Sequence, residues 1–301
     1  MNDRAAWLEE RRGGLGGSDA ASALGISKWK TPLDTYLDKR GEAPPLDDSP
    51  AMYWGRTLEP IVREEYAKRA GMIVHTGEGI LRSAEHPFML ANLDGRGADG
   101  RVVEIKTARS ADGWGDEGSA DIPADYVAQT MHYMIVTGAQ LADVAVLIAS
   151  SDFRIYTVPF DRELADMLID AERELWDRIV RGDPPAPRTA ADVANLYRVA
   201  KAQPIEATEA IYAAWEALRS LRESAKANEA AAEALETEIK AHLGACDTLT
   251  YQGQTLATWK QRKATERLDG KRLKAEAPDI WTRFAAVGEP TRTFILKEVK
   301  Q

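Results

Sequence analysis

The sequence has a single cysteine, Cys246, among its 301 residues. One thiol cannot form an intramolecular disulfide, and it cannot supply a thiolate zinc site or an iron–sulfur cluster. Long hydrophobic runs are also lacking: the longest are far too short to span a bilayer, and the first residues lack the apolar core of a signal peptide. With 44% hydrophobic residues, we expect a globular protein of a reducing cytoplasm that has no membrane partner.

Basic residues are in deficit, with 39 Lys and Arg against 48 Asp and Glu, for a net charge of -9. Residues 201–301 carry 16 basic and 15 acidic residues, so the acidic excess lies entirely in residues 1–200. A protein coated in basic surface is therefore excluded. Contact with a polyanion such as DNA would need a local groove, and a metal site built from carboxylates would add to the acidic excess.

An ATP-binding P-loop is absent. The segment Gly13–Gly17 is rich in glycine, but no Gly-Lys-Ser/Thr follows it at the required spacing, so we expect no ATP-driven motor. Ser18 or Asp19 is expected to cap a helix over residues 20–24, and free backbone N–H groups there would suit a phosphate. Taken alone, the segment is better explained as an ordinary tight turn with a helix cap.

The centre of the sequence is the segment Asn92–Thr107, which predicts a β-hairpin. Its second arm, from residue 102 to 107, is rich in β-branched residues, and a turn-forming Ala-Asp-Gly precedes it. Side chains alternate along a strand, so Glu104 and Lys106 would share one face, and Asp94 on the first arm could meet them. Two carboxylates and an ammonium group around one point suit a divalent metal and a phosphate ester, although a salt-bridged surface would show the same pattern.

Two predicted helices carry further candidates. The first covers residues 52–70 and includes Glu59; Pro60 is expected to kink it or to start a second helix. The second runs from residue 123 or 125 to 137 and places Gln129 on one face with two tyrosines. Both side chains have simpler explanations: Glu59 as a surface carboxylate, and Gln129 as a hydrogen-bonding partner of the packed tyrosines.

Three regions are predicted. Residues 1–185 form a catalytic domain that ends with a Gly-Asp-Pro-Pro sequence. Residues 186–204 form a linker, and residues 205–301 form an accessory region. The accessory region is predicted to contain a long helix over 208–243, a hairpin over 248–260, a helix near 270–276 and a last strand over 293–299. Lys260, Arg262 and Lys263 form a basic run beside an aromatic residue that could contact DNA or be a solvated face.

Five blocks of the sequence, in the same order, resemble the YqaJ-like viral recombinase group of the PD-(D/E)XK nuclease superfamily, which is related to the phage lambda exonuclease. The resemblance covers roughly residues 5–182. The blocks are Trp7 and Arg11 with Gly16-Gly17-Ser18-Asp19-Ala20; Trp54-Gly55-x-x-x-Glu59-Pro60; Ala91-Asn92-Leu93-Asp94-Gly95; Glu104-Ile105-Lys106-Thr107; and Gln129 followed by His132-Tyr133-Met134.

The resemblance implies an α/β (α+β) fold: a restriction-endonuclease-like central mixed sheet flanked by helices, followed by a helical arm and a small α+β region with a hairpin. Asp94, Glu104 and the backbone carbonyl of Ile105 resemble Mg²⁺ ligands, with Mn²⁺ as a substitute ion. Glu59 would hold a metal directly or through water, and Lys106 would orient the attacking water.

Other residues match positions that handle the substrate. Gln129 would help to place water or the strand end. Arg11 and Ser18 resemble a pair that grips a terminal 5′-phosphate, with Arg12 as an equally suitable donor.

The resulting hypothesis is a metal-dependent DNA exonuclease of a bacterial or phage-infected cytoplasm. It would degrade linear double-stranded DNA from 5′ to 3′ and leave a single strand for a separate annealing protein in phage-type recombination. The resemblance also suggests that the protein assembles into a homo-oligomeric ring. Two alternatives remain open at this point: an endonuclease or nickase with the same metal site, and a non-catalytic DNA-binding assembly module.

Overall fold

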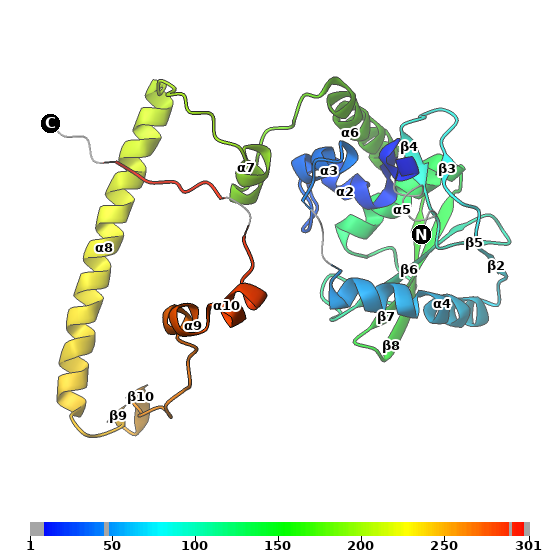
Figure 1. Ribbon diagram of the computed structural model, residues 1–301. Coiled ribbons are helices and arrows are strands. Elements are labelled where there is room, and N and C mark those ends of the chain that lie inside the picture. The colour runs from blue at the N-terminus through cyan, green and yellow to red at the C-terminus, as the bar shows by residue number, and fades with distance from the viewer. Residues whose placement is uncertain (1–8, 45–47, 289–290, 298–301) are drawn as a thin grey trace. The chain divides into compact units, whose positions relative to one another are not determined.

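The computed structural model describes residues 9–44, 48–288 and 291–297 (Figure 1). The chain divides into two compact units, and the boundary in the sequence lies between Tyr197 and Arg198. Each unit is described by itself. The first contains the predicted catalytic residues, and the second begins with a single long helix.

A five-stranded mixed sheet forms the centre of the first unit. Its order is β2-β5-β6-β7-β8, and only β6 and β7 run parallel. Valine and isoleucine dominate β6 because helices cover both of its faces. The expected α/β architecture, with a central mixed sheet flanked by helices, is confirmed. The strands are β2 (Val74–His75), β5 (Gly95–Gly97), β6 (Val102–Ala108), β7 (Leu141–Ile148) and β8 (Asp152–Pro159).

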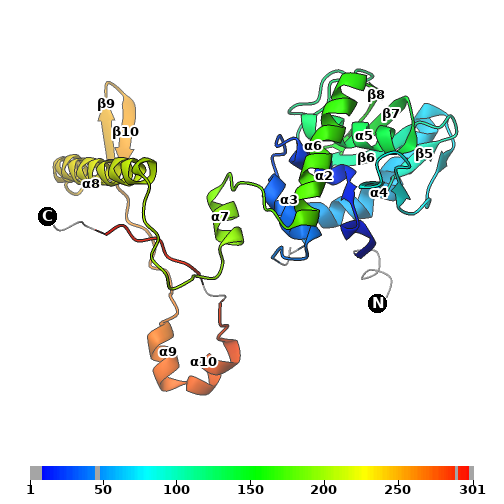
Figure 2. The ribbon, with the colours of Figure 1, turned by 90° about the horizontal axis from the view of Figure 1, so that it is seen from above.

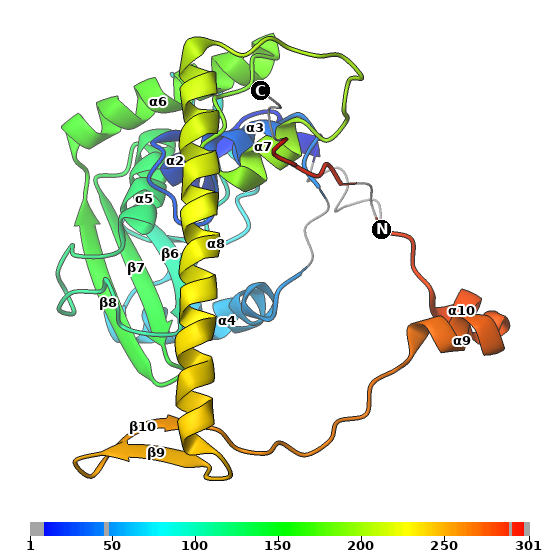
Figure 3. The same cartoon turned by 90° about the vertical axis from the view of Figure 1, so that its left-hand side faces the viewer.

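Helices cover the two faces of this sheet (Figures 2 and 3). On one face, α4 (Pro50–Ala70) buries Val62 and Tyr66 against Val103 and Ile105 of β6. On the other face, α5 (Ala124–Thr137) packs its methionines on β6 and β7, and α2 (Gly17–Ala23) and α6 (Arg162–Arg181) pack behind it. The alternation predicted for β6 is confirmed, and Glu104 therefore points toward α5.

A small second sheet connects the glycine-rich segment to the centre. In it β1 (Leu15–Gly16) runs parallel to β4 (Met89–Ala91), which pairs antiparallel with β3 (Leu81–Arg82). Helix α3 (Pro32–Lys39) follows α2, and Thr31 is its N-cap. Residues 9–12 are helical, and Trp7 lies outside the described residues.

One of the two outcomes expected at Pro60 is ruled out, and the start of α2 was predicted wrongly. Helix α4 is a single helix that includes Pro60, so no second helix begins there, and the packing of Val62 and Tyr66 holds the turns that follow the proline. Helix α2 begins at Gly17, three residues earlier than predicted. Its N-cap is Gly16, whose N–H donates to the carboxylate of Asp19, so neither Ser18 nor Asp19 is the cap.

The stretch predicted as a linker, 186–204, contains the short helix α7 (Ala190–Leu196). Asp192 of α7 accepts a hydrogen bond from the hydroxyl of Thr31 at 2.9 Å, which fastens this helix to the start of α3. The first unit thus extends to Tyr197, beyond the predicted domain end at residue 185.

The first helix of the second unit is the long α8 (Glu209–Leu243; Figure 3). It has 35 residues, and almost all of its side chains are exposed. It leads into the hairpin β9 (Thr248–Tyr251) and β10 (Gln254–Thr258), then α9 (Gly270–Glu276) and α10 (Pro278–Phe284). The sequence did not predict α10. Residues 293–297 are irregular and not the predicted strand, whose end at 298–299 lies outside the described residues. None of the described helices has the length and apolarity needed to cross a membrane.

A buried carboxylate, Asp143 on β7, ties the face of the sheet under α4 together. It accepts hydrogen bonds from the Tyr66 hydroxyl at 2.7 Å, the Arg101 guanidinium at 2.7 Å and the Thr157 hydroxyl at 2.8 Å. Asp143 is 3% exposed, so these donors stand in for water. One side chain therefore links α4, the start of β6, and β8.

We predict that Asp143→Ala lowers the free energy of unfolding by about 3–5 kcal/mol, because it leaves a buried hydroxyl and a partly buried guanidinium without their acceptor. Urea denaturation followed by circular dichroism measures the change. Asp170→Ala is the control: its carboxylate is exposed on α6, and we expect an effect below about 0.5 kcal/mol. Equal losses in the two variants would contradict this account.

Candidate active site

A cleft of about 530 Å³ opens between the glycine-rich segment, α4, β6 and α5. The structure brings together in this cleft most of the residues that the sequence singled out, although they are spread over more than 110 positions of the chain. The predicted residues that line it are Arg11, Ser18, Glu59, Asp94, Glu104, Ile105, Lys106 and Gln129.

Asp94 and Glu104 form the acidic centre of the cleft. Asp94 lies just before β5, and its Oδ2 accepts a hydrogen bond from the backbone N–H of Ile105 at 2.9 Å across the hairpin. Glu104 is 2% exposed. Its Oε1 accepts from Lys106 Nζ at 2.5 Å and from Gln129 Nε2 at 2.7 Å, whereas its Oε2 is buried without a hydrogen-bond partner in the described part of the chain.

The acidic centre carries an electrostatic cost. Burial, followed by the neighbouring charge of Glu104, raises the pKa of Asp94 from 3.8 to about 8, although the N–H of Ile105 and the ammonium of Lys106 work in the opposite direction. An acid whose folded pKa lies above its unfolded value destabilises the fold as the pH rises from about 4 to about 8. Two carboxylates in this setting call for a cation.

Lys106 and Gln129 form the polar frame around Glu104. Lys106 Nζ donates to Gln129 Oε1 at 3.0 Å and lies 4.9 Å from the ring centre of Tyr126 on α5. Burial alone would lower the pKa of Lys106, but the charges of Glu104 and Asp94 raise it above 10.5, so the side chain is a cation near neutral pH. Gln129 also donates to the Tyr133 hydroxyl at 3.1 Å, which fixes its orientation.

Glu59 lies at the side of the cleft on α4. Its Oε1 accepts from Arg63 Nη1 at 2.8 Å, and the same guanidinium donates to the backbone carbonyl of Asp94 at 2.9 Å. In the described residues no group of three or more Asp, Glu, His or Cys side chains is placed ready to hold a metal. Asp94 and Glu104 are therefore the close pair, and Glu59 is a neighbour whose charge acts on Asp94.

These residues fit a divalent cation with oxygen ligands. Among the described residues the buried Oε2 of Glu104 has no hydrogen-bond partner, and Asp94 and Glu104 concentrate negative charge in a cleft that is open to solvent. Mg²⁺ keeps several waters and binds through one or two carboxylates and substrate phosphates rather than a full protein cage. Two carboxylates with a third nearby match that requirement.

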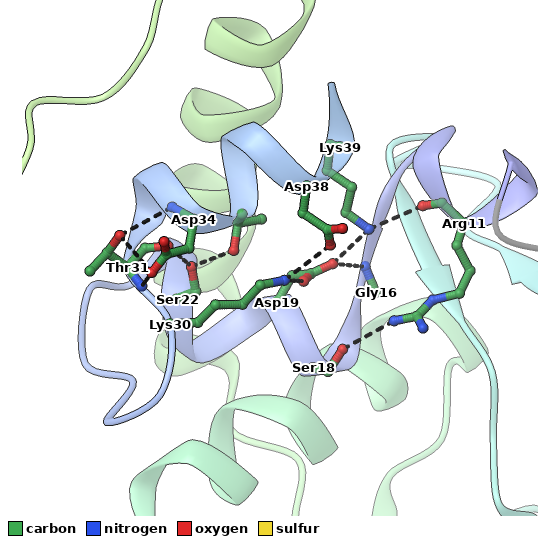
Figure 4. Close-up of polar contacts among 11 residues, drawn as sticks. Arg11, Gly16, Ser18, Asp19, Ser22, Lys30, Thr31, Asp34, Asp38 and Lys39 are labelled. Carbon is green, nitrogen blue, oxygen red and sulfur yellow. Dashed lines mark hydrogen bonds and ion pairs between the residues drawn. The ribbon is translucent and has the colours of Figure 1, made fainter. Parts of the chain in front are cut away.

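Arg11 and Ser18 also line this cleft, and Figure 4 shows their side chains turned toward each other. Arg11 Nη2 donates to the Ser18 hydroxyl at 3.4 Å. Arg12, the alternative donor, pairs with Glu9 at 3.3 Å and is not among the residues that line the cleft. Gly17 allows this part of the chain to approach α5, since an added Cβ would lie 2.5 Å from the ring of Tyr133.

Sequence reasoning missed Arg63 and Tyr126 as partners of the site. Arg63 could have been found, because it follows Glu59 by four residues and such pairs meet on one face of a helix. Tyr126 was noticed on the face of Gln129, but no local pattern indicates that it lies beside Lys106. Lys260, Arg262 and Lys263 lie on an irregular, exposed segment of the second unit, and their contact with DNA stays a prediction.

A mixed sheet with buried carboxylates and a lysine on its central hairpin is the architecture that the sequence implied, and comparison with known proteins agrees. Residues 6–140 match the YqaJ-like viral recombinase domain. The uncharacterized protein YqaJ of Bacillus subtilis (strain 168) is 36% identical over 310 residues, which cover 98% of this chain and 95% of that protein. The chain belongs to the YqaJ family.

Solved structures of low sequence identity are also similar. The alkaline exonuclease LHK-Exo from Laribacter hongkongensis has a TM-score of 0.49 and 17% identity, over 60% of this chain and 94% of the other. A phage-related exonuclease from Haemophilus somnus 129PT has a TM-score of 0.43 and 11% identity, over 56% and 96% of the two chains.

We predict that Asp94→Asn raises the melting temperature of the metal-free protein by a few degrees and abolishes the further rise caused by Mg²⁺. Asparagine keeps an acceptor for the N–H of Ile105 but removes the acid whose burial beside Glu104 is costly, and a gain of about 1 kcal/mol corresponds to ~2–4 °C. Differential scanning calorimetry with and without Mg²⁺ measures both effects.

The control for this experiment is Asp99→Asn. Asp99 belongs to the same hairpin but is paired with Arg101 at the surface, so its loss is expected to leave the Mg²⁺ response intact. A response to Mg²⁺ that survives in Asp94→Asn would show that the ion binds elsewhere.

Proposed function

We propose that this chain is a Mg²⁺-dependent deoxyribonuclease that degrades linear double-stranded DNA from its 5′ ends and exposes single strands for annealing. The observation that carries the proposal is the content of one cleft: a carboxylate–lysine centre suited to phosphodiester hydrolysis, and an Arg–Ser pair suited to a terminal phosphate. Membership of the YqaJ family supports a role in recombination.

The hydrolytic centre divides its tasks among few residues. Asp94, Glu104 and the Ile105 carbonyl would hold Mg²⁺ directly, and Glu59 would hold it through water. Bound there, the ion would act as a Lewis acid that activates water and stabilises the leaving oxygen. The ammonium of Lys106, held by Glu104 and Gln129, orients the attacking water and offsets charge that develops on the phosphate. Gln129 keeps the lysine and the carboxylate in a fixed relation.

The phosphate grip favours an exonuclease over an endonuclease. Arg11 can donate charge-assisted hydrogen bonds to phosphate oxygens, and the Ser18 hydroxyl adds a neutral donor from the next segment of the chain. A monoester at a strand end carries more negative charge than an internal diester, so this pair would hold an end while the adjacent linkage reaches Asp94 and Glu104. An enzyme that cuts internal sites has no need for such a grip.

Partners follow from the same proposal. Removal of one strand leaves the other single-stranded, and a separate annealing protein would take it up. The exposed α8 and the segments after it offer surface for such a partner or for assembly into a ring.

The decisive experiment incubates 5′-phosphorylated linear duplex and a covalently closed circle with the protein, with Mg²⁺ or with EDTA. We expect nucleotides to be released from the linear DNA only with Mg²⁺, the circle to stay intact, and Glu104→Ala to be inactive. Cutting of the circle would favour an endonuclease. Binding without release of nucleotides would favour a non-catalytic module, and full digestion by Glu104→Ala would refute the assigned centre.

We further predict that Lys106→Ala lowers the turnover number on linear duplex by roughly 10²–10³, because a charged group aimed at the transition state is lost. Single-turnover digestion under saturating protein measures the chemical step. Lys68→Ala, at an exposed position on the same unit, is the control and should digest DNA at the wild-type rate. A Lys106→Ala protein of near-normal rate would remove this residue from the mechanism.

A further inference from the structure

A buried ion-pair cluster lies beside the Arg11–Ser18 pair (Figure 4). Asp19 on α2 is 1% exposed, and its Oδ2 accepts hydrogen bonds from the N–H of Gly16 at 3.0 Å and from Lys39 Nζ at 2.8 Å. Lys39, at the end of α3, also donates to the backbone carbonyl of Arg11 at 3.0 Å. The two side chains thus hold the backbone at Arg11 and, five residues on, at Gly16.

We propose that Asp19 and Lys39 are positioning residues for the strand end: they set where the Arg11 guanidinium lies relative to the Ser18 hydroxyl and so define the terminal 5′-phosphate subsite. Neither residue lines the cleft, so each would act only through the backbone that it holds. The inference rests on the proposed function, because it needs Arg11 and Ser18 to bind a phosphate.

The charges of the cluster indicate a geometric role. Lys30 pairs with Asp19 Oδ1 at 3.0 Å and with Asp38 at 3.2 Å, so two carboxylates are balanced by two ammonium groups. Burial alone would raise the pKa of Asp19, but Lys30 and Lys39 hold it below its usual range, and the carboxylate stays ionised at neutral pH. A cluster without net charge adds little attraction for a distant phosphate, whereas its short contacts restrict the backbone.

The two lysines give a matched comparison. The side chain of Lys39 is 3% exposed and contacts the Arg11 carbonyl. The side chain of Lys30 is 30% exposed, and its hydrogen bonds within the described residues go to Asp19 and Asp38, not to the glycine-rich segment. Both lysines pair with Asp19, so Lys39→Met and Lys30→Met change the charge equally and each remove one ion pair of Asp19. Only Lys39→Met also releases the backbone of Arg11.

The test is a binding measurement in EDTA, so that no DNA is cut. Fluorescence anisotropy gives the Kd of full-length protein for the same duplex with 5′-phosphate or 5′-hydroxyl ends, and the ratio of the two values reports the grip alone. We expect the wild type to prefer the phosphate by roughly tenfold or more, since a charge-assisted contact is at stake. Lys39→Met should lose most of that preference, Lys30→Met should stay within about twofold of the wild type, and Lys39→Arg should recover part of it.

A double-mutant comparison separates positioning from a general loss of stability. In an Arg11→Ala background, Lys39→Met should change the ratio no further, because its effect passes through Arg11. If Lys39→Met is unfolded at the assay temperature by calorimetry, Asp19→Asn decides in its place: it keeps an acceptor for Gly16 but weakens the hold on Lys39, and the same loss of preference is expected.

The possible failures are distinct. If the wild type shows no preference and Arg11→Ala changes nothing, the phosphate grip itself is refuted, and the positioning role falls with it. If the wild type prefers the phosphate and Arg11→Ala abolishes this, yet folded Lys39→Met or its substitute Asp19→Asn keeps the wild-type ratio, only the positioning role is overturned. A fall of equal size in Lys39→Met and Lys30→Met would also overturn it.

Discussion

The structure depends on the placement of two carboxylates on the central hairpin, of which Glu104 is buried and Asp94 is partly buried. Carboxylates avoid such positions because desolvation and mutual repulsion both disfavour the ionised forms, and the raised pKa of Asp94 reflects that cost. A flexible loop would relieve the strain by moving the groups apart. The pairing of β5 with β6, and of β6 with β7 over seven residues, prevents this movement.

The two helices that cover the sheet contribute different kinds of support. From α5 come Gln129 and the ring of Tyr126, which hold Lys106 against Glu104. From α4 comes Arg63, which binds Glu59 and the backbone of Asp94 and so fixes the first arm of the hairpin. These contacts compensate the negative charge only in part, because one oxygen of Glu104 has no hydrogen-bond partner among the described residues. The proposed cation would complete the arrangement.

The sequence predicted those parts of the site that local patterns encode. Alternation along β6 identified the face of Glu104 and Lys106, and the helix signals around Pro123 and Gly138 placed Gln129. Contacts between distant segments were not predictable. Nothing near Lys39 indicates that its ammonium would meet Asp19 and the Arg11 carbonyl. The sequence also left open whether a second helix starts at Pro60, because the packing that keeps α4 a single helix is tertiary. The spacing and order of the sequence blocks predicted which residues belong to the site. Their distances and contacts could be seen only in the folded structure.

The backbone of β4 connects the segment that carries Arg11 and Ser18 with the acidic centre of the cleft. Gly16 pairs with Leu90, and β4 reaches Asp94 three residues after it ends. His132 of α5 faces the Leu90 carbonyl at 2.8 Å and Glu172 of α6 at 2.7 Å. A carbonyl can only accept, so Nε2 carries a proton, and a second proton is shared between Nδ1 and Glu172. His132 and Glu172 are both fully buried, and their contact holds β4 against α5 and α6. The distance from Arg11 and Ser18 to the two carboxylates is thus set by rigid elements, as the proposed attack from a strand end would require.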